Sequence, residues 1–104
     1  MSSELRISEE IIEDATIVKL SGEVDIYTSQ NLKEKLYKVI DATKSDIVIC
    51  CKELNYIDST GLGIFIGALK KAKQYESTIV IRDLKDNIKK LFVITGLDKL
   101  FVIE

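Results

Sequence analysis

The fold is decided by one short apolar run at residues 46–51, Asp-Ile-Val-Ile-Cys-Cys. A continuous run of this length, rich in β-branched residues, is typical of a central strand of a parallel sheet that is covered on both faces. We therefore expect helices on either side of it in the chain. Before the run, apolar residues recur at helical spacing from Thr28 onward, with Thr28 or Ser29 available as the N-cap. A second helical pattern follows it, from Ser59 or Thr60 towards Tyr75.

The remaining segments complete an α/β pattern. Residues 5–12 and 16–20 alternate around Glu13-Asp14 and predict a hairpin. Further strands are expected at residues 77–82 and 100–103, and a third helix at residues 85–94, which ends at a left-handed Gly96 with Leu97 packing back. The order predicts one domain over residues 1–104, with a mixed, mostly parallel sheet, right-handed crossovers and packed helices.

Composition excludes several classes of function. The chain has 104 residues, of which 46% are hydrophobic, and its 15 Lys and Arg against 17 Asp and Glu give a net charge of -2. This balance provides no basic surface for direct contact with nucleic acid. No apolar run approaches the roughly 18–20 residues of a membrane span, and the first residues do not resemble a signal peptide. We therefore expect a cytoplasmic protein that does not contact membranes.

The absence of histidine narrows the chemistry further. It excludes Ser-His-Asp and Cys-His nucleophilic catalysis and imidazole metal sites, and no cofactor or metal is expected. Cys50 and Cys51 are sequence neighbours that point to opposite faces of a strand, so a disulfide between them is not expected. Both are interpreted as buried small hydrophobic residues.

The most informative segment is residues 56–63, Tyr-Ile-Asp-Ser-Thr-Gly-Leu-Gly, where a helix begins. Three capping-type residues in a row, Asp58, Ser59 and Thr60, exceed what one N-cap needs. The structural interpretation is that they cap the helix while the glycines allow close packing. One functional interpretation makes Ser59 a phosphoacceptor, which the helix dipole would tolerate. The other, in which the backbone amides hold a nucleotide phosphate, is weaker because the spacing of a P-loop is absent.

A helical projection of this segment separates two faces. The side expected to face the sheet comprises Leu62, Phe65, Ile66, Leu69 and Ala72. The opposite side comprises Gly63, Ile64, Gly67, Lys70, Lys71 and Gln74. Two glycines on an outward face lower helix propensity, so a flat docking surface next to Ser59 is one explanation. The alternative is that another element covers this face.

A second loop, residues 21–27, joins the second strand to the first helix. Loops that follow parallel strands gather at one edge of a sheet, so Asp25 in this loop is expected to lie near Ser59. The structural alternative for Asp25 is an acid that stabilises a turn or a helix cap.

Taken together, three blocks resemble a known family. They are Gly22-Glu23-Val24-Asp25, then Asp58-Ser59-Thr60-Gly61-Leu62-Gly63, then Leu91-Phe92 with Thr95-Gly96-Leu97. In this order and at these separations the chain resembles a stand-alone STAS domain of the bacterial anti-sigma factor antagonist family. The resemblance covers nearly the whole chain, and its second block is highly specific in this context.

The resemblance implies a non-enzymatic partner switch. The unphosphorylated protein would bind an anti-sigma factor that is also a serine kinase, phosphorylation would end that binding, and a PP2C-type phosphatase would restore it. Ser59 maps onto the phosphoacceptor, Asp58 onto the acid before it, and Asp25 onto an acid implicated in partner contact and phosphorylation. The expected partner surface also includes Glu23, Tyr27, Thr60, Gly61, Gly63, Ile64 and Gly67.

Other assignments stay open on the sequence. The chain could be a STAS scaffold or regulatory subunit of a stressosome or lipid-transport complex, or it could bind a nucleotide. Its oligomeric state is expected to be a monomer or a weak dimer.

Overall fold

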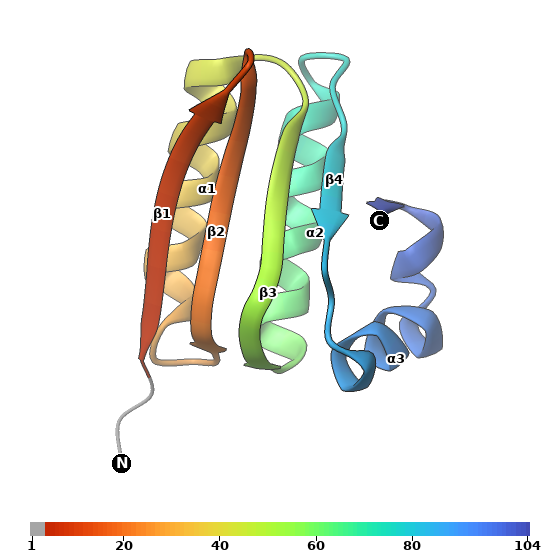
Figure 1. Cartoon of the computed structure of the whole chain (residues 1–104). Helices are drawn as coiled ribbons and strands as arrows, with labels where there is room; N and C mark the ends of the chain where they lie inside the picture. Colours follow the sequence, from red (N-terminus) through yellow and green to blue (C-terminus); the bar gives the residue numbers. More distant parts are fainter. Residues whose placement is uncertain (1–3) are drawn as a thin grey trace.

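A computed structural model describes residues 4–104 as a five-stranded sheet in the order β1-β2-β3-β4-β5. Strand β1 (Leu5–Ile12) is antiparallel to β2 (Ala15–Val24), and the parallel strands that follow are β3 (Ile47–Ile57), β4 (Ile79–Arg82) and β5 (Val102–Ile103). The connecting helices are α1 (Ser29–Thr43), α2 (Ser59–Lys73) and α3 (Asp86–Thr95), with a short 3-10 turn at Leu97–Lys99 (Figure 1). The predicted α/β class and mixed, mostly parallel sheet are confirmed.

The predicted hairpin is also confirmed. Ile12 pairs with Ala15, so the loop between β1 and β2 contains only Glu13 and Asp14. Both loop residues have positive φ angles, of 49° and 69°. This backbone matches the right-handed twist of the two strands, and it forms here without a glycine.

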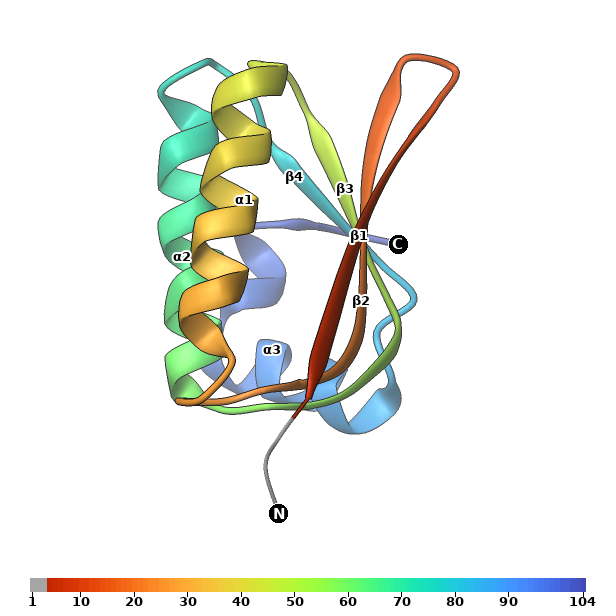
Figure 2. The ribbon, with the colours of Figure 1, turned by 90° about the vertical axis from the view of Figure 1, so that its left-hand side faces the viewer.

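Helices α1 and α2 lie side by side on one face of the sheet, and α3 lies across the end of the sheet with its inner side against α2, as Figure 2 shows edge-on. From β2 onward, each connection moves to the next strand in the same direction, and right-handed crossovers then place α1 and α2 on the same side. The expectation that residues 46–51 are covered on both faces is therefore wrong. Ile47 and Ile49 point to the helix layer and are buried, whereas Val48, on the open face, is only half-buried.

The two cysteines divide between these faces. Cys51 points to the helix layer, and burial raises the pKa of its thiol to about 12. Cys50 is half-buried on the open face, where its Sγ lies 3.9 Å from the Asp83 carboxylate. Both thiols are free, as predicted, but the interpretation of Cys50 as a buried residue is wrong.

Strands β2 and β3 extend further than the sequence pattern predicts, and this extension positions the candidate site. The apolar run that predicts this strand ends at residue 51, but residues 52–57 continue β3 with Leu54 and Ile57 buried. Register shifts between the two strands break the regular alternation, which explains why the pattern does not show the extension. As a result, Val24 pairs with Ile57 at the far end of the two strands.

Three aromatic rings anchor the helix layer. Phe65 of α2 packs edge-on against Phe92 of α3 and against Phe101, with centroid distances of 6.0 and 6.4 Å. The predicted end of α3 is confirmed, because Gly96 has a φ of 78° and Leu97 is buried. Within residues 4–104, no helix is long and apolar enough to cross a membrane.

Candidate regulatory serine and partner-binding surface

The two functional loops meet where β2 and β3 end. Val24 pairs with Ile57, and the next residue, Asp58, donates its backbone N–H to the carbonyl of Val24 at 3.2 Å. Asp25 directly follows Val24, and Ser59 directly follows Asp58, so this hydrogen bond holds the two loops together. The predicted approach of the two loops is borne out, and both lie at the edge of the sheet where α1 and α2 begin (Figure 1).

Ser59 is the first residue of α2 and is exposed. The cap is formed by its neighbour Asp58, whose Oδ1 accepts a hydrogen bond from the Gly61 N–H at 3.1 Å. The Ser59 hydroxyl makes no hydrogen bond to any residue between 4 and 104, so capping does not use it. Thr60 is exposed as well. The structural interpretation of the segment thus accounts for Asp58 and leaves the Ser59 hydroxyl available to solvent.

Asp25 stabilises the turn before α1. Its Oδ1 accepts hydrogen bonds from the backbone N–H groups of Tyr27 at 2.9 Å and Thr28 at 3.3 Å. Thr28 precedes the helix, but its hydroxyl donates to the carbonyl of Glu23 at 2.8 Å instead of capping α1. Thr28 occupies the N-cap position, as one of the two predicted candidates, but no side-chain capping bond is formed there. These bonds fix the position of a half-buried carboxylate beside the start of α2.

The turn also presents apolar side chains to solvent. Tyr27 is 77% exposed and Ile26 is 65% exposed. The sequence analysis selected Tyr27 and missed Ile26. The sequence feature that could have indicated Ile26 is its position in a loop between Asp25 and Tyr27, because a loop residue there is expected to be exposed.

The three glycines of α2 differ in their surroundings. Gly61 is buried, and a Cβ there would lie 2.6 Å from side-chain carbons of Val24 and Ile57. Gly61 therefore lets α2 approach the strand ends and is not part of the surface, contrary to its assignment to the partner surface. Gly63 is exposed, and a Cβ there would meet nothing within 4 Å.

The third glycine, Gly67, faces helix α1. A Cβ at Gly67 would lie 2.5 Å from the Tyr37 hydroxyl. The expectation of an open surface at Gly67 is therefore wrong, and the alternative, that another helix covers this part of the face, holds there.

The later turns of α2 interact with α1 through polar groups. Lys71 forms an ion pair with Asp41 at 3.1 Å and lies 5.3 Å from the centroid of the Tyr37 ring. Tyr75 donates its hydroxyl to Asp41 at 2.7 Å. This bond and Lys71 lower the pKa of the Asp41 carboxyl, and the same bond raises the pKa of Tyr75. Helix α1 thus covers the outward face at Gly67 and Lys71, whereas Gly63 in the first turns of α2, next to Ser59, is open; Lys70 and Gln74 further along the helix are also exposed.

Two isoleucines flank the open position at Gly63. Ile64 is half-buried at the edge of the outward face. Ile66 was assigned to the side facing the sheet, but it is also only half-buried. Each side chain therefore packs partly on the helix layer and leaves some apolar surface accessible.

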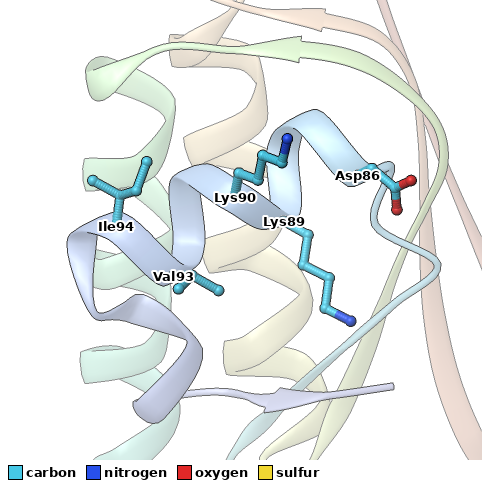
Figure 3. A pocket seen from close by; sticks show the side chains of 5 residues that line it. All are labelled: Asp86, Lys89, Lys90, Val93 and Ile94. Carbon is cyan, nitrogen blue, oxygen red and sulfur yellow. The ribbon is translucent and has the colours of Figure 1, made fainter.

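Helix α3 carries an exposed hollow that the sequence analysis did not select (Figure 3). Its volume is about 390 Å³, and it is lined by Asp86, Lys89, Lys90, Val93 and Ile94. Val93 is 55% exposed and Ile94 is 79% exposed. The sequence feature that could have indicated it is the run of four consecutive apolar residues at 91–94. Four consecutive residues spread around a helix and cannot all point to one buried face.

The fold and the site together define a small α/β domain with an accessible serine at the start of a helix beside a fixed carboxylate. The chain belongs to the STAS domain family, whose model matches residues 6–104. Within that family it is similar to anti-sigma factor antagonists. The anti-sigma-B factor antagonist of Bacillus subtilis (strain 168) is 39% identical over 80 residues, which cover 77% of this chain and 72% of that protein.

Solved structures agree with this assignment. An anti-sigma factor antagonist from Mycobacterium paratuberculosis has a TM-score of 0.83 and 25% sequence identity, covering 96% of this chain and 85% of that chain. The Bacillus cell fate determinant SpoIIAA in its phosphorylated form has a TM-score of 0.70 at 17% identity, covering 99% of this chain and 91% of that chain. At this low identity the SpoIIAA match shows only that the two chains share a fold. The predicted family is therefore confirmed.

Proposed function

We propose that this chain is an anti-sigma factor antagonist whose partner binding is controlled by phosphorylation of Ser59. The observation that carries the proposal is the exposed Ser59 at the start of α2, with a hydroxyl that the Asp58 cap leaves unused. Similarity to an anti-sigma-B factor antagonist supports the choice of partner. The chain would act by binding and not as an enzyme, in the cytoplasm.

In this proposal the unphosphorylated chain binds an anti-sigma factor and thereby frees a sigma factor. The binding surface combines the first turns of α2 with the loop before α1. Its exposed members are Thr60, Gly63, Tyr27 and Ile26, flanked by the less exposed Ile64, Glu23, Asp25 and Asp58. Gly63 leaves space for a partner backbone to approach closely.

Phosphorylation would act at the centre of this surface. The anti-sigma factor, as a serine kinase, would transfer the γ-phosphoryl group of ATP to the Ser59 oxygen, releasing ADP and the hydroxyl proton. The new group carries about 1.5–2 negative charges, which the positive end of the α2 dipole tolerates. A PP2C-type phosphatase would hydrolyse the phosphoester and restore binding.

The test is intact-mass analysis after incubation with the cognate kinase and ATP. The mass is expected to increase by one phosphoryl group, Ser59→Ala should abolish the increase, and Thr60→Ala should retain it. Thr60 is the matched control because it is the adjacent exposed hydroxyl. An unmodified wild-type chain would contradict the switch and favour a scaffold role in a stressosome or lipid-transport complex.

A nucleotide-binding role has less support. Three hollows lie at α3, on the open face of the sheet, and beside the turn between β1 and β2. None of these three is lined by a residue of the segment 58–63. A calorimetric titration of the chain with ATP, in the absence of kinase, is expected to show no binding.

A pair of glycine substitutions is expected to separate the partner surface from the helix interface. Gly63→Leu should leave stability unchanged or raise it by up to about 1 kcal/mol, because it adds helix propensity in open space. It should also weaken binding of the anti-sigma factor by obstructing the partner. Gly67→Leu should lower stability, because its side chain must displace Tyr37.

Thermal melts with parallel partner titrations measure both effects. If Gly63→Leu bound the partner as tightly as wild type, the first turns of α2 would not be the binding surface.

A further inference from the structure

Strand β1 is an open edge of the sheet. It has eight residues, and all of them pair with β2 on one side. In the described sheet no strand pairs with its other side, and Figure 1 shows it as the outermost strand. Such an edge presents unpaired backbone N–H and C=O groups that another strand can use.

The hairpin turn determines which residues present those groups. In a two-residue turn the flanking pair, here Ile12 and Ala15, is a hydrogen-bonded pair, and such pairs recur at every second residue of an antiparallel ladder. The even-numbered residues of β1 therefore bond to β2. The Glu4 carbonyl, which accepts from the Glu23 N–H at 2.9 Å, follows the same pattern. The outward backbone groups belong to Leu5, Ile7, Glu9 and Ile11.

We propose that β1 pairs antiparallel with β1 of a second copy of this chain, in a register centred on Ser8. In this register Arg6 lies opposite Glu10 of the second copy, and the two-fold symmetry forms this pair twice. Arg6 is exposed and forms no ion pair with any residue in the range 4–104. Glu10 already forms an exposed ion pair with Lys19 at 2.9 Å, so its carboxylate would be shared between Lys19 and Arg6 of the second copy. Leu5 then lies opposite Ile11, a side chain that is 70% exposed in the single chain.

Charge selects this register over its neighbours. A pairing centred on Glu9 would place two Glu9 carboxylates directly opposite each other, which destabilises a strand pair. A pairing centred on Ile7 would place Arg6 opposite Ser8 and Leu5 opposite Glu9, so Arg6 would form no ion pair across the two strands. A register shifted by a single residue would place residues with outward backbone groups opposite residues whose backbone groups already bond to β2, so the two strands could not form a regular ladder. The register centred on Ser8 also places Ile7 opposite Glu9 of the second copy. It is nevertheless the one of these registers that combines the Arg6–Glu10 ion pairs, the Leu5–Ile11 contacts and matched backbone bonding.

The pairing would join the two sheets into one and leave both partner surfaces accessible. Antiparallel strands place equivalent ends at opposite ends of the joined sheet, so the two Ser59 residues would lie far apart. Each copy would then bind its own partner. The dimer is thus independent of phosphorylation at Ser59, and the proposed function does not depend on it.

The test is sedimentation of the full chain over a range of concentrations up to about 1 mM. The wild type is expected to show a monomer–dimer equilibrium, and Arg6→Glu should weaken it by at least about tenfold by turning two attractive pairs into repulsive ones. The triple variant Arg6→Glu, Glu10→Arg and Lys19→Glu should return to within about threefold of wild type, since it exchanges the charges within each pair and keeps an opposite charge beside residue 10, where Lys19 lies in the wild type. Circular dichroism verifies that each variant is folded.

A cross-link tests the register directly. In a background with Cys50→Ser, Ser8→Cys is expected to form a disulfide-linked dimer under mild oxidation, because the two Ser8 positions would be directly opposite. The matched control is Ser21→Cys, an exposed serine on the neighbouring strand β2, which should remain monomeric. A wild type that stays monomeric throughout, a charge exchange that does not restore association, or equal cross-linking of the two variants would overturn the proposal.

Discussion

Phosphorylation of Ser59 is expected to weaken binding of the anti-sigma factor by several kcal/mol, on the order of a hundredfold or more in Kd. The phosphate would be introduced beside the Asp58 carboxylate and next to the loop that holds Asp25. In a docked interface it would be desolvated and would repel these acids and any acidic partner group. Isothermal titration of both forms measures the difference.

Substitutions at the same position test this electrostatic explanation. Ser59→Ala should bind constitutively, and Ser59→Asp should bind weakly, although a single carboxylate carries less charge than a phosphate. Thr60→Asp is the matched control, with the same charge on the adjacent exposed residue. It should lose less affinity, because its side chain leaves the helix in a different direction. Wild-type affinity in Ser59→Asp would contradict the explanation.

Phe65→Ala is expected to lower the free energy of unfolding by about 3–5 kcal/mol. Phe65 has no exposed surface and packs against the rings of both Phe92 and Phe101, so the truncation removes contacts to both and leaves a cavity. For a domain of this size each kcal/mol corresponds to roughly 4–8 °C in Tm, so the melting temperature should fall by more than about 12 °C.

The control for this substitution is Ile94→Ala in α3. Ile94 is 79% exposed, and its truncation should change stability by no more than about 0.5 kcal/mol. Urea unfolding of the two variants provides the comparison. A loss below about 1 kcal/mol in Phe65→Ala would show that the helix layer is not held by this ring cluster.

Local patterns in the sequence predicted most of the elements. Apolar periodicity located the strands and helices, and the Gly96-Leu97 pair marked the end of α3, because each depends on residues close in the chain. The Ser59 site was predictable for the same reason. A run of capping residues before a helix is a local feature, and Asp58 alone fulfils the capping role.

The surroundings of the site were decided by the tertiary structure. A helical projection places Gly63 and Gly67 on one face, but only the packing of α1 brings Tyr37 over Gly67. Gly61 appeared equivalent in sequence and became a buried contact with Val24 and Ile57 because β2 and β3 extend together. The sequence by itself determined the type, order and approximate position of each element and where the accessible serine lies. Tertiary structure decided the one-sided helix layer, the open face of the sheet that carries Cys50, and the free β1 edge, because these depend on the direction of successive crossovers and on contacts between distant residues.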